Sequence, residues 1–200
     1  MQPPERSPGQ LIAGKIIVVF FGMTASGKST LGKAWADQCR AAYYNTDRVR
    51  KELAGLQASD KRPDRVGQGI YSPAFTEKTY QTMLDKASND FSLGERMVVL
   101  DGSYSRRGDR NLVRSVAAAM GGRCVFIFCT CPEDEVRRRL ALRARDPEAV
   151  SDGRWEIYLH QRQSFELPDR GLEDDCIQLN TDQSVETLVQ WLAAQPYWQG

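Results

Sequence analysis

The sequence predicts an α/β domain with a parallel five-stranded sheet and helices on both faces. Short apolar stretches of strand length alternate along the chain with longer stretches of helical spacing, which is the pattern of repeated strand-helix-strand units. The first apolar stretch, Lys15–Phe21 (KIIVVFF), is continuous instead of alternating, as expected for a strand buried on both faces of a parallel sheet. A chain of 200 residues is long enough to bury one sizeable core.

The expected elements follow in order from these patterns. The strands are short and rich in β-branched or aromatic residues, and they cover residues 15–21, 43–45, 97–100, 124–129 and 176–179. The spacing of apolar residues predicts helices over residues 28–41, 47–53, 73–91, 111–120, 132–145, 152–165 and 184–194. Pro73 suits the first turn of its helix, because the backbone donors there have no intrahelical acceptor. Residues 55–72 are expected to form a loop.

Residues 1–13 differ in composition from the rest of the chain. They contain prolines and charges but no apolar cluster, which predicts a flexible N-terminal tail before a single domain over residues 14–200. The longest apolar run, residues 16–21, is too short to span a membrane, so we expect no membrane contact. Five cysteines, an odd number, favour reduced thiols in the cytoplasm. The only histidine, His160, is far from the cysteines, so no zinc site is expected and no role is assigned to it.

A phosphate-binding loop is expected after the first strand. Residues 22–29 (GMTASGKS) match the pattern G-x-x-x-x-G-K-[ST], and they stand between a buried strand and a helix, where this motif has to lie. Glycines allow the backbone to turn its N–H groups toward phosphate oxygens, and the helix N-terminus adds a positive dipole. The residues expected to bind ATP here are Gly22, Thr24, Ala25, Ser26, Gly27, Lys28, Ser29 and Thr30.

Three side chains are expected around the phosphates. Lys28 is predicted to reach the β- and γ-phosphates as a catalytic residue, and Ser29 to offer its hydroxyl to Mg²⁺. Residues 98–101 (VVLD) form an apolar strand that ends in an acid, so Asp101 is predicted to help hold the same hydrated ion or to face the transferring group. The alternative for Asp101 is a turn or a helix cap. Neither N-K-x-D nor a D-x-x-G near Asp101 is present, so the usual GTPase signals are missing and the predicted cofactors are ATP and Mg²⁺.

A further acidic group follows the second strand. In residues 45–50 (NTDRVR), Asp47 and Arg50 are three apart and share a face of the expected helix. An aspartate there can accept the proton of an attacking hydroxyl, or only orient it, since the transition states of phosphoryl transfer are loose. We predict that Asp47 is catalytic and that both residues bind the acceptor. The alternative is that Thr46 or Asp47 caps the helix and that Arg50 is a solvated charge.

Six segments resemble the AAA_33 group of P-loop kinases: GMTASGKSTLGKAWA, YYNTDRVRKELAG, GQGIYSPAFTEKTYQTML, VVLDGSY, VRRRLALRARD and SDGRWEIYLHQRQSFE. The resemblance extends over roughly residues 15–180 and includes the kinase-like half of bifunctional aminoglycoside-phosphotransferase/ATP-binding proteins. It implies a P-loop NTPase fold with a helical lid. Polynucleotide 5′-hydroxyl kinases are more distantly similar, and their D-x-x-R motif implies that Asp47 is the general base and that Arg50 contacts the substrate.

The arginine-rich run at residues 137–145 resembles the lid of such kinases. Arg139 and Arg143 are four residues apart, so they lie on one edge of the expected helix. Guanidinium groups pair with phosphate oxygens and neutralise charge that develops during transfer. We therefore expect both residues to bind ATP and Arg143 to be catalytic, whereas Arg137 and Arg138 are expected on a solvated face.

Tyrosines are expected in the walls of the acceptor site. Tyr71 precedes the long helix at residues 73–91 and Tyr104 follows Asp101, and both are predicted to bind substrate by stacking on a sugar or base. The alternative is that these rings pack against helices. The aromatic residues of the helix at residues 152–165 are expected to lie in the core.

Together these residues predict an ATP-dependent phosphotransferase that moves the γ-phosphate of ATP to a hydroxyl of a small-molecule acceptor. One alternative is a polynucleotide 5′-hydroxyl kinase, but a net charge of +1 does not favour a surface that follows a nucleic-acid backbone. Another is a nucleotide-binding module that acts through a partner, and a toxin kinase controlled by an antitoxin also fits. Residues 180–183 are expected at the edge of the adenine.

Overall fold

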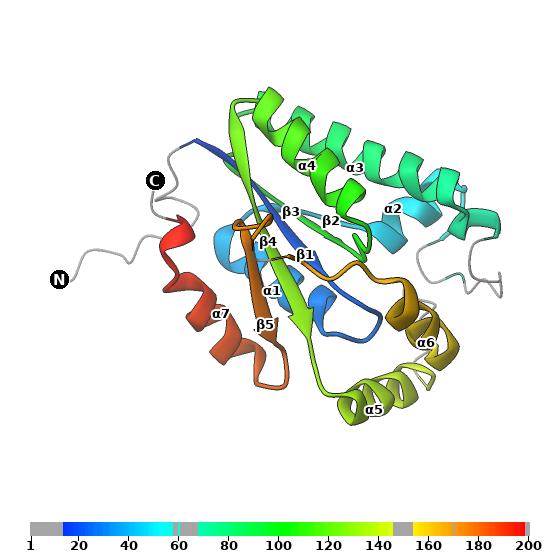
Figure 1. Cartoon of the computed structure of the whole chain (residues 1–200). Coiled ribbons are helices and arrows are strands. Elements are labelled where there is room, and N and C mark those ends of the chain that lie inside the picture. The colour runs from blue at the N-terminus through cyan, green and yellow to red at the C-terminus, as the bar shows by residue number, and fades with distance from the viewer. Residues whose placement is uncertain (1–13, 58–59, 61–67, 146–153, 170, 199–200) are drawn as a thin grey trace.

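The computed structural model describes residues 14–57, 60, 68–145, 154–169 and 171–198. Its strands form one parallel sheet in the order β2-β3-β1-β4-β5 (Figure 1). The strands are β1 (Lys15–Phe21), β2 (Ala42–Asn45), β3 (Met97–Gly102), β4 (Gly122–Thr130) and β5 (Cys176–Asn180). The prediction of an α/β fold with a parallel five-stranded sheet is confirmed.

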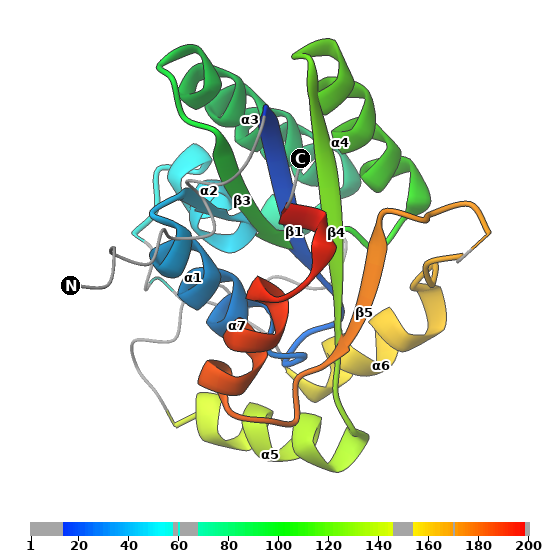
Figure 2. The same cartoon turned by 90° about the vertical axis from the view of Figure 1, so that its left-hand side faces the viewer.

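Helices cover both faces of this sheet. They are α1 (Lys28–Cys39), α2 (Thr46–Leu53), α3 (Pro73–Ser92), α4 (Arg107–Ala119), α5 (Glu133–Arg143), α6 (Trp155–Ser164) and α7 (Val185–Ala193). In the view of Figure 1, α3 and α4 lie above the sheet, and α1 and α7 lie below it. α5 and α6 pack together beyond the carboxyl ends of the strands, as both views show (Figures 1 and 2). This is the position of the expected helical lid, at the edge of the sheet where ligands bind.

Strand β1 lies at the centre of the sheet and supplies both halves of the core. Its residues from Ile16 to Phe21 are all 0% exposed. Ile16, Val18 and Phe20 pack toward α1 and α7, and the alternate residues pack toward α3 and α4. A strand covered on both faces has no polar side, which explains the continuous apolar run. Burial of each such side chain contributes about 1.5–3 kcal/mol to stability.

Many predicted boundaries differ from the structure by one or two residues, and the start of α4 differs by four. Helix α4 begins at Arg107 and not at residue 111, because its first turns carry arginines that interrupt the apolar pattern. Arg110 is nevertheless 0% exposed, since the buried carboxylate of Glu173, from another segment, neutralises it. Strand β3 runs past the predicted end to Gly102, so Asp101 is part of the strand and pairs with Phe20 of β1.

Some predictions fall on residues outside the described ranges. These are the tail at residues 1–13, part of the loop at residues 55–72 and the start of the helix at residues 152–165. Within that loop the structure adds a short 3-10 helix, η2 (Gly69–Tyr71), directly before α3. Among the helices described, none combines the length and the apolar character that crossing a membrane requires.

Candidate phosphate and acceptor site

The P-loop, residues 22–29, connects β1 to α1 in the conformation that its glycines allow. Gly22 has φ of 145°, and a Cβ there would lie 2.4 Å from the carbonyl oxygen of Cys129. Gly27 has φ of 82° and stands before α1 without a side-chain cap. The first N–H groups of α1 are therefore free of a side-chain capping acceptor, and such groups, with the positive end of the helix dipole, form an anion site.

Lys28 and Ser29 stand at the start of α1, beside this loop. The ammonium group of Lys28 donates a hydrogen bond to the carbonyl oxygen of Met23 at 3.2 Å, so the side chain bends back over the P-loop. Both residues line a cavity of about 830 Å³ at the carboxyl end of the sheet. The same cavity is lined by many of the other residues predicted for catalysis or binding: Thr24, Asp47, Arg50, Tyr71, Asp101 and Arg143.

Asp101 is held by a polar clamp from β2. Asn45 is its neighbour in the β2–β3 register, and the Asn45 amide and the Tyr43 hydroxyl each donate to Asp101 Oδ2 at 2.6 Å. Asp101 Oδ1 is buried and has no hydrogen-bond partner among the described residues. Tyr43 also lies 3.4 Å from the carbonyl oxygen of Ser29, so it bridges the two residues predicted to hold magnesium.

The Tyr43 hydroxyl of this clamp keeps its proton over the whole ordinary pH range. Burial, strengthened by the negative charge of Asp101, raises the pKa of Tyr43 above its ordinary value of 10. Tyr43 therefore remains a hydrogen-bond donor that fixes one carboxylate oxygen of Asp101. The other oxygen is left free for a ligand. Neither Tyr43 nor Asn45 was assigned a role from the sequence, because only the strand register brings them to Asp101.

Asp47 and Arg50 form an ion pair at the start of α2. Arg50 Nη1 lies 2.9 Å from Asp47 Oδ1, and the guanidinium group stacks 4.9 Å above the ring of Tyr71. Arg50 is only 6% exposed, and its Nε is buried without a partner among the described residues. The helix cap is Asn45, whose side chain accepts from the backbone of Arg48. The alternative in which Thr46 or Asp47 caps α2 and Arg50 is solvated is therefore wrong.

Arg143 lies between the large cavity and a second cavity of about 460 Å³. The second cavity is bordered by Gly27 of the P-loop, by Thr30 in the first turn of α1 and by residues 181–183 after β5. Burial lowers the pKa of Arg143 from its usual value, while the charges of Asp47 and Asp101 favour the protonated form. Because Arg143 lines both cavities, its charge is within reach of a ligand in either one.

Arg139, predicted to bind phosphate with Arg143, is largely occupied by protein contacts. Its Nε donates to Glu135 at 2.6 Å, and Nη2 donates to the carbonyl oxygen of Thr181 at 2.8 Å. Nη1 lies 3.3 Å from the carbonyl oxygen of Ala25 in the P-loop. In this arrangement Arg139 joins α5, the P-loop and the loop after β5. Binding of ATP by this residue remains a prediction.

The prediction for Tyr104 needs a correction. Its side chain is 0% exposed and stacks on Tyr80 with the ring centroids 4.3 Å apart, and it does not line the large cavity. A stacked aromatic pair contributes about 0.5–1.5 kcal/mol beyond the burial of its area, which favours this buried position of the Tyr104 ring. Tyr71, in contrast, does line the cavity, where it supports Arg50.

Helix α6 contributes a face to the site that sequence analysis missed. Ile157, His160, Gln161 and Ser164 line the large cavity, and their spacing places them on one side of the helix. Between them Tyr158 packs on Ala25 of the P-loop, which agrees with the expectation that the aromatic residues of this helix are in the core. The i, i+3, i+4, i+7 spacing was the signal that could have identified this face.

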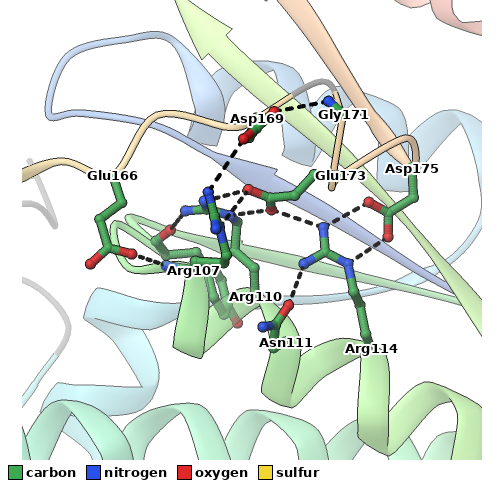
Figure 3. Close-up of polar contacts among 10 residues, drawn as sticks. Arg107, Arg110, Asn111, Arg114, Glu166, Asp169, Gly171, Glu173 and Asp175 are labelled. Atoms are coloured by element: carbon green, nitrogen blue, oxygen red, sulfur yellow. Dashed lines mark hydrogen bonds and ion pairs between the residues drawn. The ribbon is translucent and has the colours of Figure 1, made fainter.

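A network of ion pairs fastens the segment between α6 and β5 to α4 (Figure 3). Arg110 and Glu173 are both buried and make paired hydrogen bonds of 2.7 and 2.8 Å. Arg114 binds Glu173 at 2.9 Å and Asp175 at 2.7 Å. At the other end of the segment, the backbone of Glu166 donates to Ser105, which lines the large cavity. The network thus supports one wall of the cavity.

Comparison with known proteins adds a family and a fold. The AAA_33 family model, described as an AAA domain, matches residues 17–168. Uncharacterized proteins of Mycobacterium tuberculosis and Mycobacterium bovis are 31% identical to this chain over 123 residues, which are 62% of this chain and 24% of each relative. The chain therefore spans about a quarter of the length of the curated relatives that it matches.

Several solved structures share the fold of the chain. A sugar kinase from Janibacter sp. HTCC2649 has a TM-score of 0.63 at 17% identity, covering 94% of this chain and 99% of its own. A gluconokinase from Sinorhizobium meliloti 1021 has a TM-score of 0.58 at 19% identity and covers 98% and 99%. The APS kinase of Mycobacterium tuberculosis, in complex with AMPPNP and APS, has a TM-score of 0.57 at 21% identity and covers 90% and 95%. The P-loop kinase fold expected from the sequence is confirmed.

Proposed function

The chain belongs to the AAA_33 family, and from this premise we propose that it is an ATP-dependent phosphotransferase that moves the γ-phosphate of ATP to a hydroxyl of a small-molecule acceptor. The observation that carries the proposal is the convergence of Lys28, Asp47, Asp101 and Arg143 on one cavity. The names of the similar structures, a sugar kinase, a gluconokinase and an APS kinase, support a small acceptor.

In this proposal the two cavities hold the two substrates. The cavity beside residues 181–183 takes the adenine and ribose of ATP, with Arg139 and the P-loop on its border. The large cavity takes the acceptor, with its hydroxyl directed at Asp47. Arg143 borders both and lies where the γ-phosphate passes between them. A volume of about 830 Å³ accommodates a sugar-sized or nucleoside-sized molecule.

The donor atoms around Asp101 fit a magnesium ion. Mg²⁺ prefers oxygen ligands and is usually held in kinases by a few protein groups together with phosphates and water. Asp101 Oδ1 is a buried carboxylate oxygen without a partner among the described residues, and the Ser29 hydroxyl borders the same cavity. We propose that these atoms hold Mg²⁺, which supplies charge neutralisation for the phosphates.

The transfer itself needs few protein groups. The acceptor hydroxyl gives its proton to the Asp47 carboxylate, its oxygen bonds to the γ-phosphorus, and the bond from that phosphorus to the β,γ-bridging oxygen breaks to release ADP. The ion pair with Arg50 holds the carboxylate in place. Lys28 and Arg143 donate to phosphate oxygens as negative charge builds up. A location in the cytoplasm belongs to the same proposal and agrees with the five free cysteines.

The function is tested by incubating the protein with labelled ATP and Mg²⁺ and pools of sugars, nucleosides, aminoglycosides and 5′-hydroxyl oligonucleotides. We expect transfer to one of the small-molecule pools. Because a positioned general base contributes roughly 10²–10⁴ in rate, Asp47→Asn should lower the transfer rate at least about 100-fold. Asp37→Asn, an exposed aspartate on α1, is the matched control and should retain full activity. Transfer to oligonucleotides alone, or ATP binding without any transfer, contradicts the proposal.

Arg143→Ala is expected to slow phosphoryl transfer by at least about two orders of magnitude, because an arginine that stabilises the transferring group is worth roughly 10³–10⁵ in rate. The effect should appear in kcat measured by product formation with saturating ATP. Arg145→Ala removes an exposed arginine two residues away and should change the rate by less than about twofold. A loss below about fivefold for Arg143→Ala removes this residue from the catalytic group.

A further inference from the structure

Helix α6 makes a direct polar contact with the P-loop. The backbone N–H of Thr24 donates to Gln161 Oε1 at 2.7 Å, across 137 positions of sequence. Both residues line the large cavity. Since N–H groups of a P-loop are the expected ligands of phosphate oxygens, a side chain that binds one of them lies within reach of the nucleotide.

The contact determines which way the Gln161 amide faces. The partner of Oε1 is an N–H group, which can only donate, so the carbonyl oxygen must face the loop and Nε2 must face away from it. None of the described residues accepts a hydrogen bond from Nε2. The amide therefore presents two N–H donors to the wall of the large cavity, where a ligand can accept them.

Packing holds this part of α6 in place. Tyr158, one turn earlier, is 6% exposed and packs on Ala25 of the P-loop and on Val136 and Leu140 of α5. On another side of the helix, Arg162 forms an ion pair with Glu133 at the start of α5. The position of Gln161 thus rests on a packed helix pair and not on its single hydrogen bond.

The two cavities show which side of the P-loop Gln161 contacts. Ala25 and Gly27 border the second cavity, whereas Thr24, like Lys28 and Ser29, borders the large cavity. Thr24 therefore lies on the side of the loop that faces the large cavity, the proposed acceptor site. In the proposed function this is where the γ-phosphate meets the acceptor hydroxyl.

We propose that Gln161 is a catalytic residue of the transfer, which rests on the function proposed above. Its Oε1 satisfies the Thr24 amide, and its Nε2 donates to an oxygen of the γ-phosphoryl group during transfer. Negative charge on the equatorial phosphoryl oxygens is the quantity that such a donor stabilises. No proton moves to or from the glutamine, because an amide donor stays neutral throughout.

Gln161→Glu tests the direction of Nε2, because it keeps an oxygen for the Thr24 amide and places a negative oxygen where the donor was. We expect the affinity for AMPPNP with Mg²⁺, measured by titration calorimetry, to fall at least about tenfold, since like charges close together repel strongly in a partly buried site. Affinity for ADP, which lacks the γ-phosphate, should change by less than about threefold. The rate of transfer should fall at least about tenfold.

Gln163→Glu is the matched control, because it makes the same change in charge on an exposed position of α6. It should bind AMPPNP and ADP as the wild type does. If Gln161→Glu behaves like Gln163→Glu while the wild type transfers phosphate, only the role of Gln161 is overturned. If Gln161→Ala binds AMPPNP more tightly than the wild type, the glutamine is a plug that the nucleotide displaces, which also overturns the proposal. A wild-type protein that binds neither nucleotide overturns the proposed function itself, and the role of Gln161 with it.

Discussion

Replacing Lys28 by alanine is expected to abolish turnover of ATP, with a loss of at least about 10³ in rate. Lys28 is the first residue of α1, and its ammonium group already lies over the P-loop, 3.2 Å from the carbonyl oxygen of Met23. This carbonyl oxygen is a neutral acceptor, so negatively charged phosphate oxygens can replace it as the partner of the ammonium group. Removal of the ammonium group leaves the β- and γ-phosphates without their nearest lysine, and no other lysine of the described residues lines either cavity.

The measurement is ATP consumption and product formation under saturating Mg²⁺, together with the unfolding transition of each variant. Lys33→Ala is the matched control, since Lys33 is an exposed residue of the same helix that pairs with Asp37. It should retain turnover within about twofold, because exposed i, i+4 pairs contribute only about 0.3–0.5 kcal/mol. Unchanged turnover in Lys28→Ala would falsify the assignment of the P-loop as the site of phosphate transfer.

Glu173→Gln is expected to lower the free energy of unfolding by about 3–5 kcal/mol, because it leaves a buried guanidinium without its counter-charge. Arg110 is 0% exposed and directs its Nε and Nη2 to the two oxygens of Glu173, which is 2% exposed. Arg114 also binds this carboxylate (Figure 3). Urea unfolding at neutral pH measures the loss. Glu95→Gln, at an exposed position, should change the free energy by less than about 0.5 kcal/mol.

The same carboxylate predicts a dependence of stability on pH. Burial alone would raise the pKa of Glu173, but the hydrogen bonds from Arg110 and Arg114 outweigh it and lower the pKa from 4.5 to about 2. A group with a lowered pKa in the folded state stabilises the protein fully above its unfolded pKa and loses that effect as the pH falls. The difference in unfolding free energy between wild type and Glu173→Gln should therefore shrink by about 3 kcal/mol between pH 5 and pH 2. A difference that stays constant with pH contradicts the prediction.

The sequence by itself determined the fold class and the phosphate loop. A strand buried on both faces needs an unbroken apolar run, and residues 16–21 of β1 form one. An element with one face in water would instead alternate apolar and polar residues. The P-loop is also local, because its glycines, Lys28 and Ser29 act within a few residues of one another. The carboxylate at the end of β3 could be predicted for the same reason, since parallel strands end at one edge.

The contacts around the large cavity, the proposed acceptor site, were decided only by the tertiary structure. Gln161 meets Thr24 across 137 positions, and Tyr43 reaches Asp101 through the register of β2 and β3, so no local pattern marks either contact. The same cause explains the wrong prediction that Tyr104 lines the acceptor site. Its ring stacks on Tyr80 of α3, a contact with a distant segment that the sequence does not reveal. Local sequence sets backbone conformation and the face of each element, whereas the partner of a polar or aromatic side chain depends on which distant segment packing brings beside it.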